Sequence, residues 1–257
     1  MEWDLPAGVD WSGLAGYVGG TALVMARVLG LCLTAPGLAV PGLDWRFRVG
    51  LAVMLGAVLA PVVVSQVVPP PDLPGVAWAG FAEVLTGGLI GWTAGLIVAG
   101  ARSAGEFVSA QAGLSTSTLF DPESGEELTA LGRLYGWIAT AALLAMDGPL
   151  ALVRAVADSY TVIPAGRLAP SLDSAKLVFG QVGHALELAL RAAAPPAIAL
   201  VMAGIVMGWL SRTAPALPFL ALSLPIRAAI GIVLVLLGLV TLAAVLSAAW
   251  SGLLPAR

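Results

Sequence analysis

Charged residues are scarce in this chain of 257 residues. Asp, Glu, Lys and Arg together make up 11% of it, whereas 59% is apolar and the mean hydropathy is +0.97. A soluble domain carries about 25% charged residues, so too little polar surface is present to cover a globule in water. Aromatic residues are also few, at 7%, while glycines number 31. This composition favours close helix packing over β-structure, and the sequence predicts an all-α integral membrane protein.

Other shortages exclude functional classes. The net charge is only -3 and no Lys/Arg cluster occurs, so no nucleic-acid partner is expected. The single cysteine, Cys32, cannot form an internal disulfide and is interpreted as a small core residue. With one histidine, no phosphate-binding loop and no nucleophile–base arrangement, the chain is predicted to be no enzyme and to hold no metal or other cofactor. The acidic N-terminus lacks the basic region of a cleavable signal peptide, so insertion is expected to rely on the helices themselves.

Six apolar segments reach the length of about 20 residues that a membrane-spanning helix needs. They are Ser12–Leu33, Val49–Val68, Val76–Ala101, Leu128–Met146, Val178–Leu210 and Ala228–Leu254. The fifth is too long for one straight span and is expected to be broken at Pro195-Pro196. The charged, amphipathic region from Pro149 to Lys176 is expected to lie at an interface. Lys and Arg outside the spans favour an outside N-terminus only by six to four, a weaker bias than a conventional six-span protein shows.

The longest polar interval runs from Arg102 to Leu128, between two apolar segments. Its first half keeps an apolar stripe at helical spacing, formed by Phe107, Ala110 and Leu114. The Ser124–Glu127 spacing is that of a capping box and predicts that the fourth helix begins near Gly125, or three residues earlier at Asp121-Pro122. The residues alone leave two interpretations open, a re-entrant or pore-facing element and an ordinary exposed loop.

Two charges fall inside apolar segments. Arg27 lies in the first, where a central arginine costs about 2.5–3.5 kcal/mol on the insertion scale and each Leu or Val returns about 0.3–0.6 kcal/mol. The eight Leu and Val residues from Leu14 to Leu33 return roughly 2.4–4.8 kcal/mol on that scale, so the helix is marginal alone. We expect a buried protein partner for Arg27, the alternative being that it snorkels to the interface. Glu83 is expected to form a structural ion pair or lie at the interface, rather than to relay protons.

Four polar side chains form a stripe on the fifth segment. Gln181, His184, Glu187 and Arg191 follow one another at helical spacing, and Glu187 to Arg191 is the favourable i,i+4 order. A histidine and a glutamate supply only two metal ligands, so a stripe that meets another helix is expected instead. Arg27, Glu83 and this stripe are our candidates for polar residues at a subunit interface. Small-xxx-small pairs, which let helices approach closely, are Gly16/Gly20, Gly91/Gly95, Gly132/Gly136 and Gly204/Gly208.

Several motifs follow one another in a recognisable order. They are ARVLGLCLTAPGLAVPGLDWRFRVGLA at 26–52, Glu83 with Gly88 and Gly91, Ala104-Gly105, Gln111 and Gly113, Asp121-Pro122 with Gly125, and SYTVIPAG at 159–166. In this order and spacing the chain resembles the FliR family of flagellar type III export-gate proteins and its injectisome counterparts. Two stretches depart from the family pattern, MDGPL at 146–150 and TAPALPFLALSLP after Arg212.

The resemblance implies a membrane-embedded helical subunit of an export gate. It would be present in one copy beside several FliP-type and FliQ-type subunits, with FlhB- and FlhA-type proteins nearby. The assembly would pass unfolded export substrates across the bacterial inner membrane at the flagellar basal body, in contact with membrane lipid. The resemblance also implies strongly tilted helical hairpins, with residues 1–175 similar to a FliP subunit and residues 176–257 similar to a FliQ subunit.

The resemblance further implies that the segment from Gly105 to Pro122 contributes to the plug of the channel. The residues carried over are Gly105, Glu106, Phe107, Gln111, Gly113, Leu114, Ser115, Asp121 and Pro122. Small side chains would let a loop pack across a pore and still move, while the glutamates of the interval are interpreted as helix-start and rim residues. The alternative function is a self-sufficient secondary transporter, which should show an internal repeat and matched broken helices; the sequence shows no convincing repeat.

Overall fold

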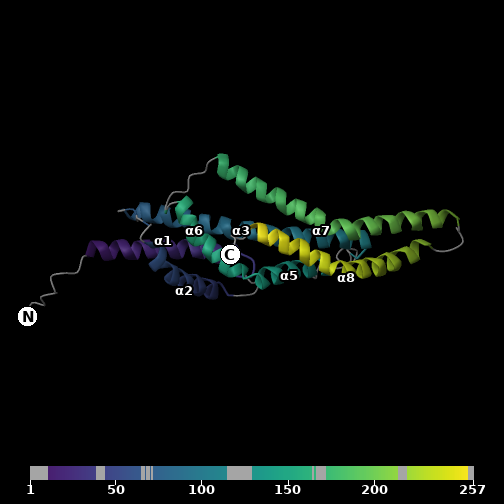
Figure 1. Ribbon diagram of the computed structural model, residues 1–257, viewed down its shortest axis with the longest axis horizontal. Coiled ribbons are helices and arrows are strands. Elements are labelled where there is room, and N and C mark those ends of the chain that lie inside the picture. The colour runs from purple at the N-terminus through teal and green to yellow at the C-terminus, as the bar shows by residue number, and fades with distance from the viewer. Residues whose placement is uncertain are drawn as a thin grey trace, which may run out of the picture. The chain divides into compact units, whose positions relative to one another are not determined.

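All regular elements in the described part of the chain are helices (Figure 1). The computed structural model describes residues 11–38, 44–64, 67, 70, 72–114, 129–163, 165, 172–213 and 219–253. The helices are α1 (Trp11–Thr34), α2 (Trp45–Val63), α3 (Leu73–Ala112), α5 (Ala130–Ala145), α6 (Gly148–Val162), α7 (Leu172–Thr213) and α8 (Phe219–Leu253). Five of the described helices are long and apolar enough to cross a membrane, or six if α5 and α6 count as one broken span. The prediction of an all-α membrane protein is confirmed.

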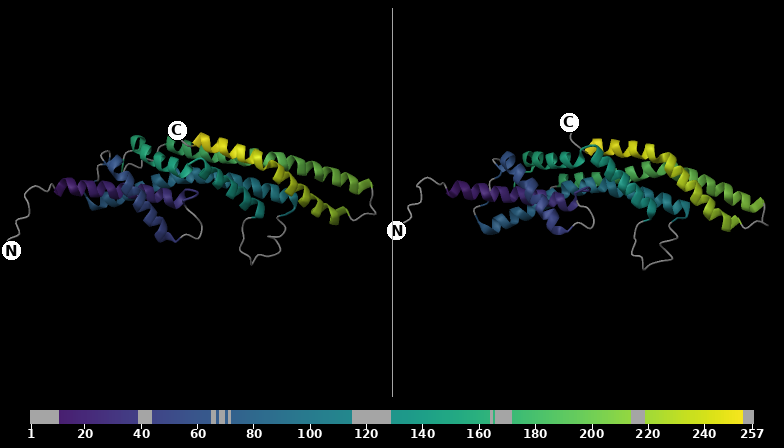
Figure 2. Two further views of the ribbon diagram at one scale, coloured as in Figure 1. Left: turned by 60° about the horizontal axis from the view of Figure 1, so that its bottom comes forward. Right: turned by 90° about the horizontal axis from the view of Figure 1, so that it is seen from below.

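The chain divides into two compact units. Residues 1–92 and 149–172 form the first, and residues 93–148 and 173–257 form the second. The first unit therefore holds α1, α2, the beginning of α3 and nearly all of α6. The second holds the rest of α3, with α5, α7 and α8, of which α7 and α8 run side by side as an antiparallel hairpin (Figures 1 and 2). The division into a FliP-like and a FliQ-like part concerns likeness to other proteins and stays a prediction.

Small residues let α2 pack closely on α1 in the first unit. The buried positions of α2 recur every three to four residues and are all small or β-branched, namely Ala52, Gly56, Ala60 and Val63. A Cβ placed on Gly56 would lie 2.7 Å from Met25 Cγ of α1. Packing of this kind is the usual way for helices to associate where lipid supplies no hydrophobic driving force. Helix α2 begins at Trp45, before the predicted Val49, so Arg46 and Arg48 lie in its first turn.

In the second unit, α3, α5, α7 and α8 contact one another. Trp250 of α8 is fully buried, and its Nε1 donates a hydrogen bond to the carbonyl of Ala139 on α5 at 3.0 Å. On α3, a Cβ at Gly100 would lie 2.5 Å from the carbonyl oxygen of Ala185 on α7. Helix α8 comes close to the end of α3, where a Cβ at Gly231 would lie 2.7 Å from that of Ala112.

The first half of the polar interval is helical, as its apolar stripe predicted. Helix α3 continues past Ala101 to Ala112, because Ala104, Val108 and Ala112 extend its buried face at a spacing of four. Helix α5 begins at Ala130, later than the predicted Gly125 or Asp121. Thr129 is its N-cap, with an extended backbone and a side-chain oxygen that accepts a hydrogen bond from the amide of Gly132. The capping box at 124–127 lies outside the described residues.

The predicted break at Pro195-Pro196 is wrong. Helix α7 runs through both prolines, although its ribbon changes direction part-way along (Figure 1), as expected where prolines remove helical hydrogen bonds. The interruption lies instead after Ala145, where Asp147 adopts a φ of 56° before α6 begins at Gly148. A left-handed residue cannot continue a right-handed helix.

The prediction that residues 149–176 lie at an interface stays a prediction, but part of this region belongs to the core. Residues 148–162 form α6, and one of its faces is packed against the protein. Leu152, Val156 and Tyr160 are buried at a spacing of four, so this face belongs to the core of the first unit. Helix α7 then begins at Leu172, within the region that was expected at the interface.

Candidate functional site

A buried ion pair joins α1 to α3 in the first unit. Arg27 Nε donates to Glu83 Oε2 at 2.5 Å, and Arg27 Nη2 donates to Glu83 Oε1 at 3.1 Å. The two side chains are 0% and 1% exposed. Such a two-bond pairing of guanidinium and carboxylate is stronger and more directional than a single contact. Arg27 was expected to have a buried protein partner because its insertion into a membrane is costly. That partner is Glu83 of the same chain.

Helix α6 and the residue that follows it complete the pairing. Arg27 Nη1 donates to Ser159 Oγ at 2.7 Å, and Nη2 also donates to the carbonyl of Ile163 at 3.1 Å. The guanidinium carbon lies 3.7 Å from the centre of the Tyr160 ring, and the Tyr160 hydroxyl donates to Glu83 Oε2 at 3.2 Å. A buried charge is tolerated when it is paired and hydrogen-bonded in this way, and the aromatic ring adds a cation–π attraction. We call Arg27, Glu83, Ser159, Tyr160 and Ile163 the Arg27 cluster.

Glycines set the distance between α1 and α3 that the cluster requires. A Cβ on Gly87 would overlap the carbonyl oxygen of Arg27, and one on Gly30 would lie 2.7 Å from the amide nitrogen of Gly88. The hydroxyl of Thr34 donates across the same contact to the carbonyl of Gly88 at 2.9 Å. Because the backbones touch directly, Glu83, one turn before Gly87, lies opposite Arg27.

The Arg27 cluster confirms one expectation and corrects another. Glu83 forms a structural ion pair, as expected. The assignment of Arg27 and Glu83 to a subunit interface is wrong, because both are enclosed by their own chain. Sequence reasoning missed Ser159, Tyr160 and Ile163 as partners, yet all three lie in the SYTVIPAG motif. The motifs around Arg27, Glu83 and Ser159 that carried the family resemblance therefore meet at one buried site.

The predicted plug residues fall at the end of α3. Gly105, Glu106, Phe107 and Gln111 lie on the helix, while Ser115, Asp121 and Pro122 lie outside the described residues. The helix ends at Gly113, whose φ is 73°. The amide of Leu114 donates to Ser109 O at 3.0 Å and that of Gly113 to Ala110 O at 3.2 Å, the two bonds of a Schellman motif. The described part of the interval therefore closes with a well-formed helix end.

Glu106 holds the start of α5. Its Oε1 accepts hydrogen bonds from the amide of Thr129 at 2.8 Å and from the hydroxyl of Thr129 at 3.0 Å. The first amides of a helix have no partner within the helix and favour negative charge nearby. Close contact accompanies these bonds, since a Cβ on Gly105 would lie 2.6 Å from the carbonyl oxygen of Leu131. Glu106 thus acts as a helix-start residue, as expected of the glutamates in this interval.

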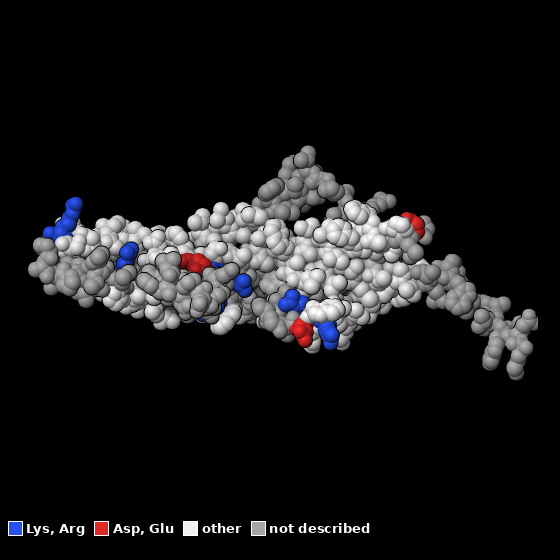
Figure 3. Space-filling view, turned by 180° about the vertical axis from the view of Figure 1, so that it is seen from behind, with Lys and Arg blue, Asp and Glu red and all other residues white. Residues whose placement is uncertain are grey.

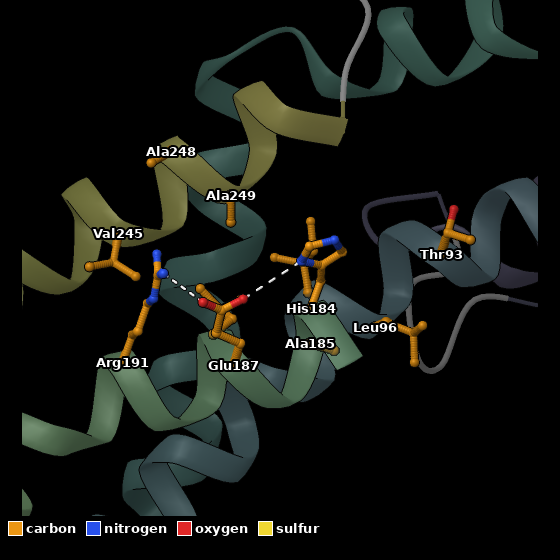
Figure 4. A pocket seen from close by; sticks show the side chains of 11 residues that line it. Thr93, Leu96, His184, Ala185, Glu187, Arg191, Val245, Ala248 and Ala249 are labelled. Carbon is orange, nitrogen blue, oxygen red and sulfur yellow. Dashed lines mark hydrogen bonds and ion pairs between the residues drawn. The ribbon is translucent and has the colours of Figure 1, made fainter. Parts of the chain in front are cut away.

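The polar stripe of α7 borders a cavity of about 400 Å³ in the second unit (Figure 4). Arg191 Nη2 donates to Glu187 Oε1 at 2.5 Å, and His184 Nδ1 lies 3.7 Å from Glu187 Oε2. The opposite walls are apolar or small side chains of α3 and α8, including Leu96, Ile97, Val245, Ala248 and Ala249. The side chains of His184, Glu187 and Arg191 remain 77%, 51% and 69% exposed. Gln181 lies on the same helix, but its side chain is outside the described residues.

The sequence matches the family described as "Bacterial export proteins, family 1" over residues 18–253. The chain belongs to this family. It is 30% identical over 219 residues to the flagellar biosynthetic protein FliR of Caulobacter vibrioides, covering 85% of this chain and 87% of the relative. Against FliR of Escherichia coli K12 the identity is 30% over 209 residues, covering 81% and 79% of the two chains. The Yop proteins translocation protein T of Yersinia pestis is 27% identical over 157 residues, 60% of each chain.

These matches confirm the resemblance inferred from motif order. The matched range of the export family runs from within α1 to the end of α8, so it includes all members of the Arg27 cluster. Among the described residues, no group of three or more His, Cys, Asp and Glu side chains is placed to hold a metal ion. Two of the described polar groups, the Arg27 cluster and Glu106, hold helices to one another.

Proposed function

We propose that this chain is a structural channel subunit of the flagellar or type III protein export gate, passing unfolded substrates across the bacterial inner membrane. The family match over residues 18–253 carries this proposal. The relatives include a protein named for flagellar biosynthesis and one named for Yop translocation, so the proposal covers both flagellar and type III export. Five helices long and apolar enough to span agree with a multi-pass membrane protein.

A structural role also fits the chemistry of the buried polar groups. Arg27 and Glu83 use their charges on each other and on α6, so Glu83 is no free carboxylate for proton relay or catalysis. We infer that the chain has no enzymatic activity of its own. Nothing in the structure or in the comparisons favours the secondary-transporter alternative.

The partners that we propose are FliP- and FliQ-type subunits, with FlhB- and FlhA-type proteins nearby. The polar stripe of α7 is exposed although it lies in an apolar span. This supports a neighbouring subunit there, because charges at membrane depth are costly unless they face protein or water. In this proposal His184, Glu187 and Arg191, with Gln181, contact a neighbouring subunit. Purification through a tag on this chain should therefore yield FliP- and FliQ-type subunits with it. A stable, monodisperse monomer in mild detergent would contradict the proposal.

We further propose that the segment after α3 contributes to the channel plug. The structure sharpens the deletion that tests this, since removing Gly105–Ala112 would destroy the end of α3 and the bonds from Glu106 to Thr129. Deletion of residues 115–122 spares both. We expect the deletion variant to co-purify with the same subunits while the cell membrane leaks ions and small molecules. A Gly/Ser replacement of equal length controls for chain length, and an assembled deletion variant in a tight membrane would refute the plug.

A further inference from the structure

The part of the α7–α8 hairpin that follows Glu187 carries positive charge and no carboxylate. From Leu188 to Arg257 the sequence contains four arginines and no aspartate or glutamate. Arg191 is paired with Glu187, and Arg257 lies outside the described residues. The two arginines that remain are Arg212 and Arg227. Arg212 is the last residue of one apolar span, Val182–Arg212, and Arg227 is the third residue of the next, Pro225–Ser251. They flank the same turn of the hairpin.

Arg227 is seated against bare backbone. A Cβ on Gly204 of α7 would lie 2.8 Å from Arg227 Nη2 and 3.3 Å from its Cζ, so the guanidinium rests where any other residue would place a side chain. Its Nε is buried and has no hydrogen-bond partner within the described residues. A buried donor without an acceptor is costly, more so when it is charged. Arg227 as a whole is only half-buried, and of its nitrogens only Nε is buried without a partner, so an acceptor from outside the described chain can reach the Nη nitrogens.

The surroundings of Arg227 match the edge of a bilayer. Large apolar side chains beside it are exposed, among them Ile205 and Ile226, and Trp209 is 73% exposed. At 1.5 Å per residue, Arg212 lies about 12 Å beyond Gly204 along α7. The 31-residue span of α7 is about 46 Å long, against about 30 Å of hydrocarbon, so it is long enough for the end of the hairpin to reach the headgroup layer. Tryptophan and arginine gather at this depth in membrane proteins.

We propose that Arg227, with Arg212 farther out, binds the phosphate of an anionic phospholipid headgroup. A guanidinium suits phosphate because its planar fork donates two parallel hydrogen bonds. The exposed apolar side chains beside it lie against the acyl chains. The face drawn in Figure 3 is mostly uncharged, with a few Lys, Arg, Asp and Glu side chains on it. Arg212 and Arg227 combine positive charge, missing carboxylates and a position at the end of a span. The proposal requires membrane insertion alone and does not depend on the export function.

Lipid retained by the purified protein tests the site. The tagged protein, with whatever subunits accompany it, is extracted in mild detergent and its bound phosphatidylglycerol is measured per chain. We expect Arg227→Gln to reduce retention about five-fold and Arg212→Gln to reduce it less, with Arg227→Lys between wild type and Arg227→Gln. Arg154→Gln on α6 is the control, because that arginine is exposed and belongs to the first unit, outside the α7–α8 hairpin; it should retain lipid as the wild type does.

A stability measurement separates lipid from protein as the partner of Arg227. Wild type and Arg227→Gln are placed in phosphatidylcholine nanodiscs with and without phosphatidylglycerol, and their thermal unfolding is followed. We expect phosphatidylglycerol to raise the melting temperature of the wild type and to leave that of the variant unchanged. Two results would overturn the proposal: equal lipid retention by wild type and variant, or an equal loss of stability in both lipids together with loss of a co-purified subunit. The second would identify a protein carboxylate as the partner.

Discussion

Replacing Glu83 by alanine is expected to destabilise the first unit by about 3–5 kcal/mol. The substitution leaves the charge of Arg27 fully buried with only Ser159, Ile163 and the Tyr160 ring around it. These neutral groups cannot replace a carboxylate that accepts two hydrogen bonds. A loss of this size lowers the ratio of folded to unfolded protein by more than a hundred-fold. Thermal unfolding of the purified protein in detergent measures it.

A charge-free version of the site is the matched control. Arg27→Met with Glu83→Leu removes both charges and keeps similar volumes, and apolar replacement of a buried pair is often neutral or stabilising. Tyr160→Phe is added because the Tyr160 hydroxyl donates to Glu83 and would otherwise lose its acceptor. We expect this triple variant to be much more stable than Glu83→Ala. Equal stability of Glu83→Ala and wild type would show that the ion pair contributes nothing.

The second large effect is expected from Gly87→Ala. A Cβ at this position would overlap the Arg27 carbonyl oxygen and lie 3.1 Å from the amide nitrogen of Leu31. Both obstacles are backbone, so α1 and α3 must separate, and the Arg27–Glu83 distances must lengthen with them. Overpacking of this kind costs about 1–3 kcal/mol. The melting temperature should fall, and steady-state levels in the membrane should fall with it.

Gly80→Ala on the same helix is the control for this substitution. Nothing lies within 4 Å of a Cβ at Gly80, so the added methyl group meets open space. Alanine has a higher helix propensity than glycine by about 1 kcal/mol, and the control should be neutral or slightly stabilising. If both variants behaved alike, close contact between α1 and α3 would not be what holds the Arg27 cluster together.

The need for a partner to Arg27 could be predicted because its cost is local. The insertion energies of one arginine and its neighbouring Leu and Val residues depend on a single helix. The identity of the partner depends on how two helices cross, and Glu83 is 56 residues away along the chain. The glycines that set this crossing, Gly30 and Gly87, were not among the small-residue pairs singled out, although Gly91 of the same contact was. Pattern spacing shows that helices can approach without showing which ones do.

The apolar stripe correctly predicted a helix in the first half of the polar interval, but Phe107 and Ala110 of that stripe are exposed, so it did not identify the buried face. Arg102 and Glu106 lower the hydropathy after Ala101, but α3 continues because Ala104 and Val108 still have a buried face to fill. Charges on one side of α6 likewise suggested an interfacial segment, while the opposite side carried Leu152, Val156 and Tyr160 at helical spacing. That spacing was visible in the sequence and would have placed Tyr160 in the core.

The effect of two prolines on helix continuity was overestimated. Pro195 and Pro196 were expected to break the fifth segment, yet they lie inside α7. Prolines are tolerated in membrane helices because neighbouring helices and local adjustments satisfy the backbone groups that they free. The actual interruption follows Ala145, where Asp147 has a positive φ. It falls in MDGPL, one of the two stretches that departed from the family pattern.

Secretion of flagellar or type III substrates by cells that lack this chain tests the central claim most directly. Substrate protein is quantified in the medium from a strain with the gene deleted, and from the same strain carrying the wild-type chain or Glu83→Ala on a plasmid. An export-gate subunit predicts no detectable secretion after deletion, full restoration by the wild type and little by Glu83→Ala. Undiminished secretion from the deletion strain would contradict the assignment to the gate.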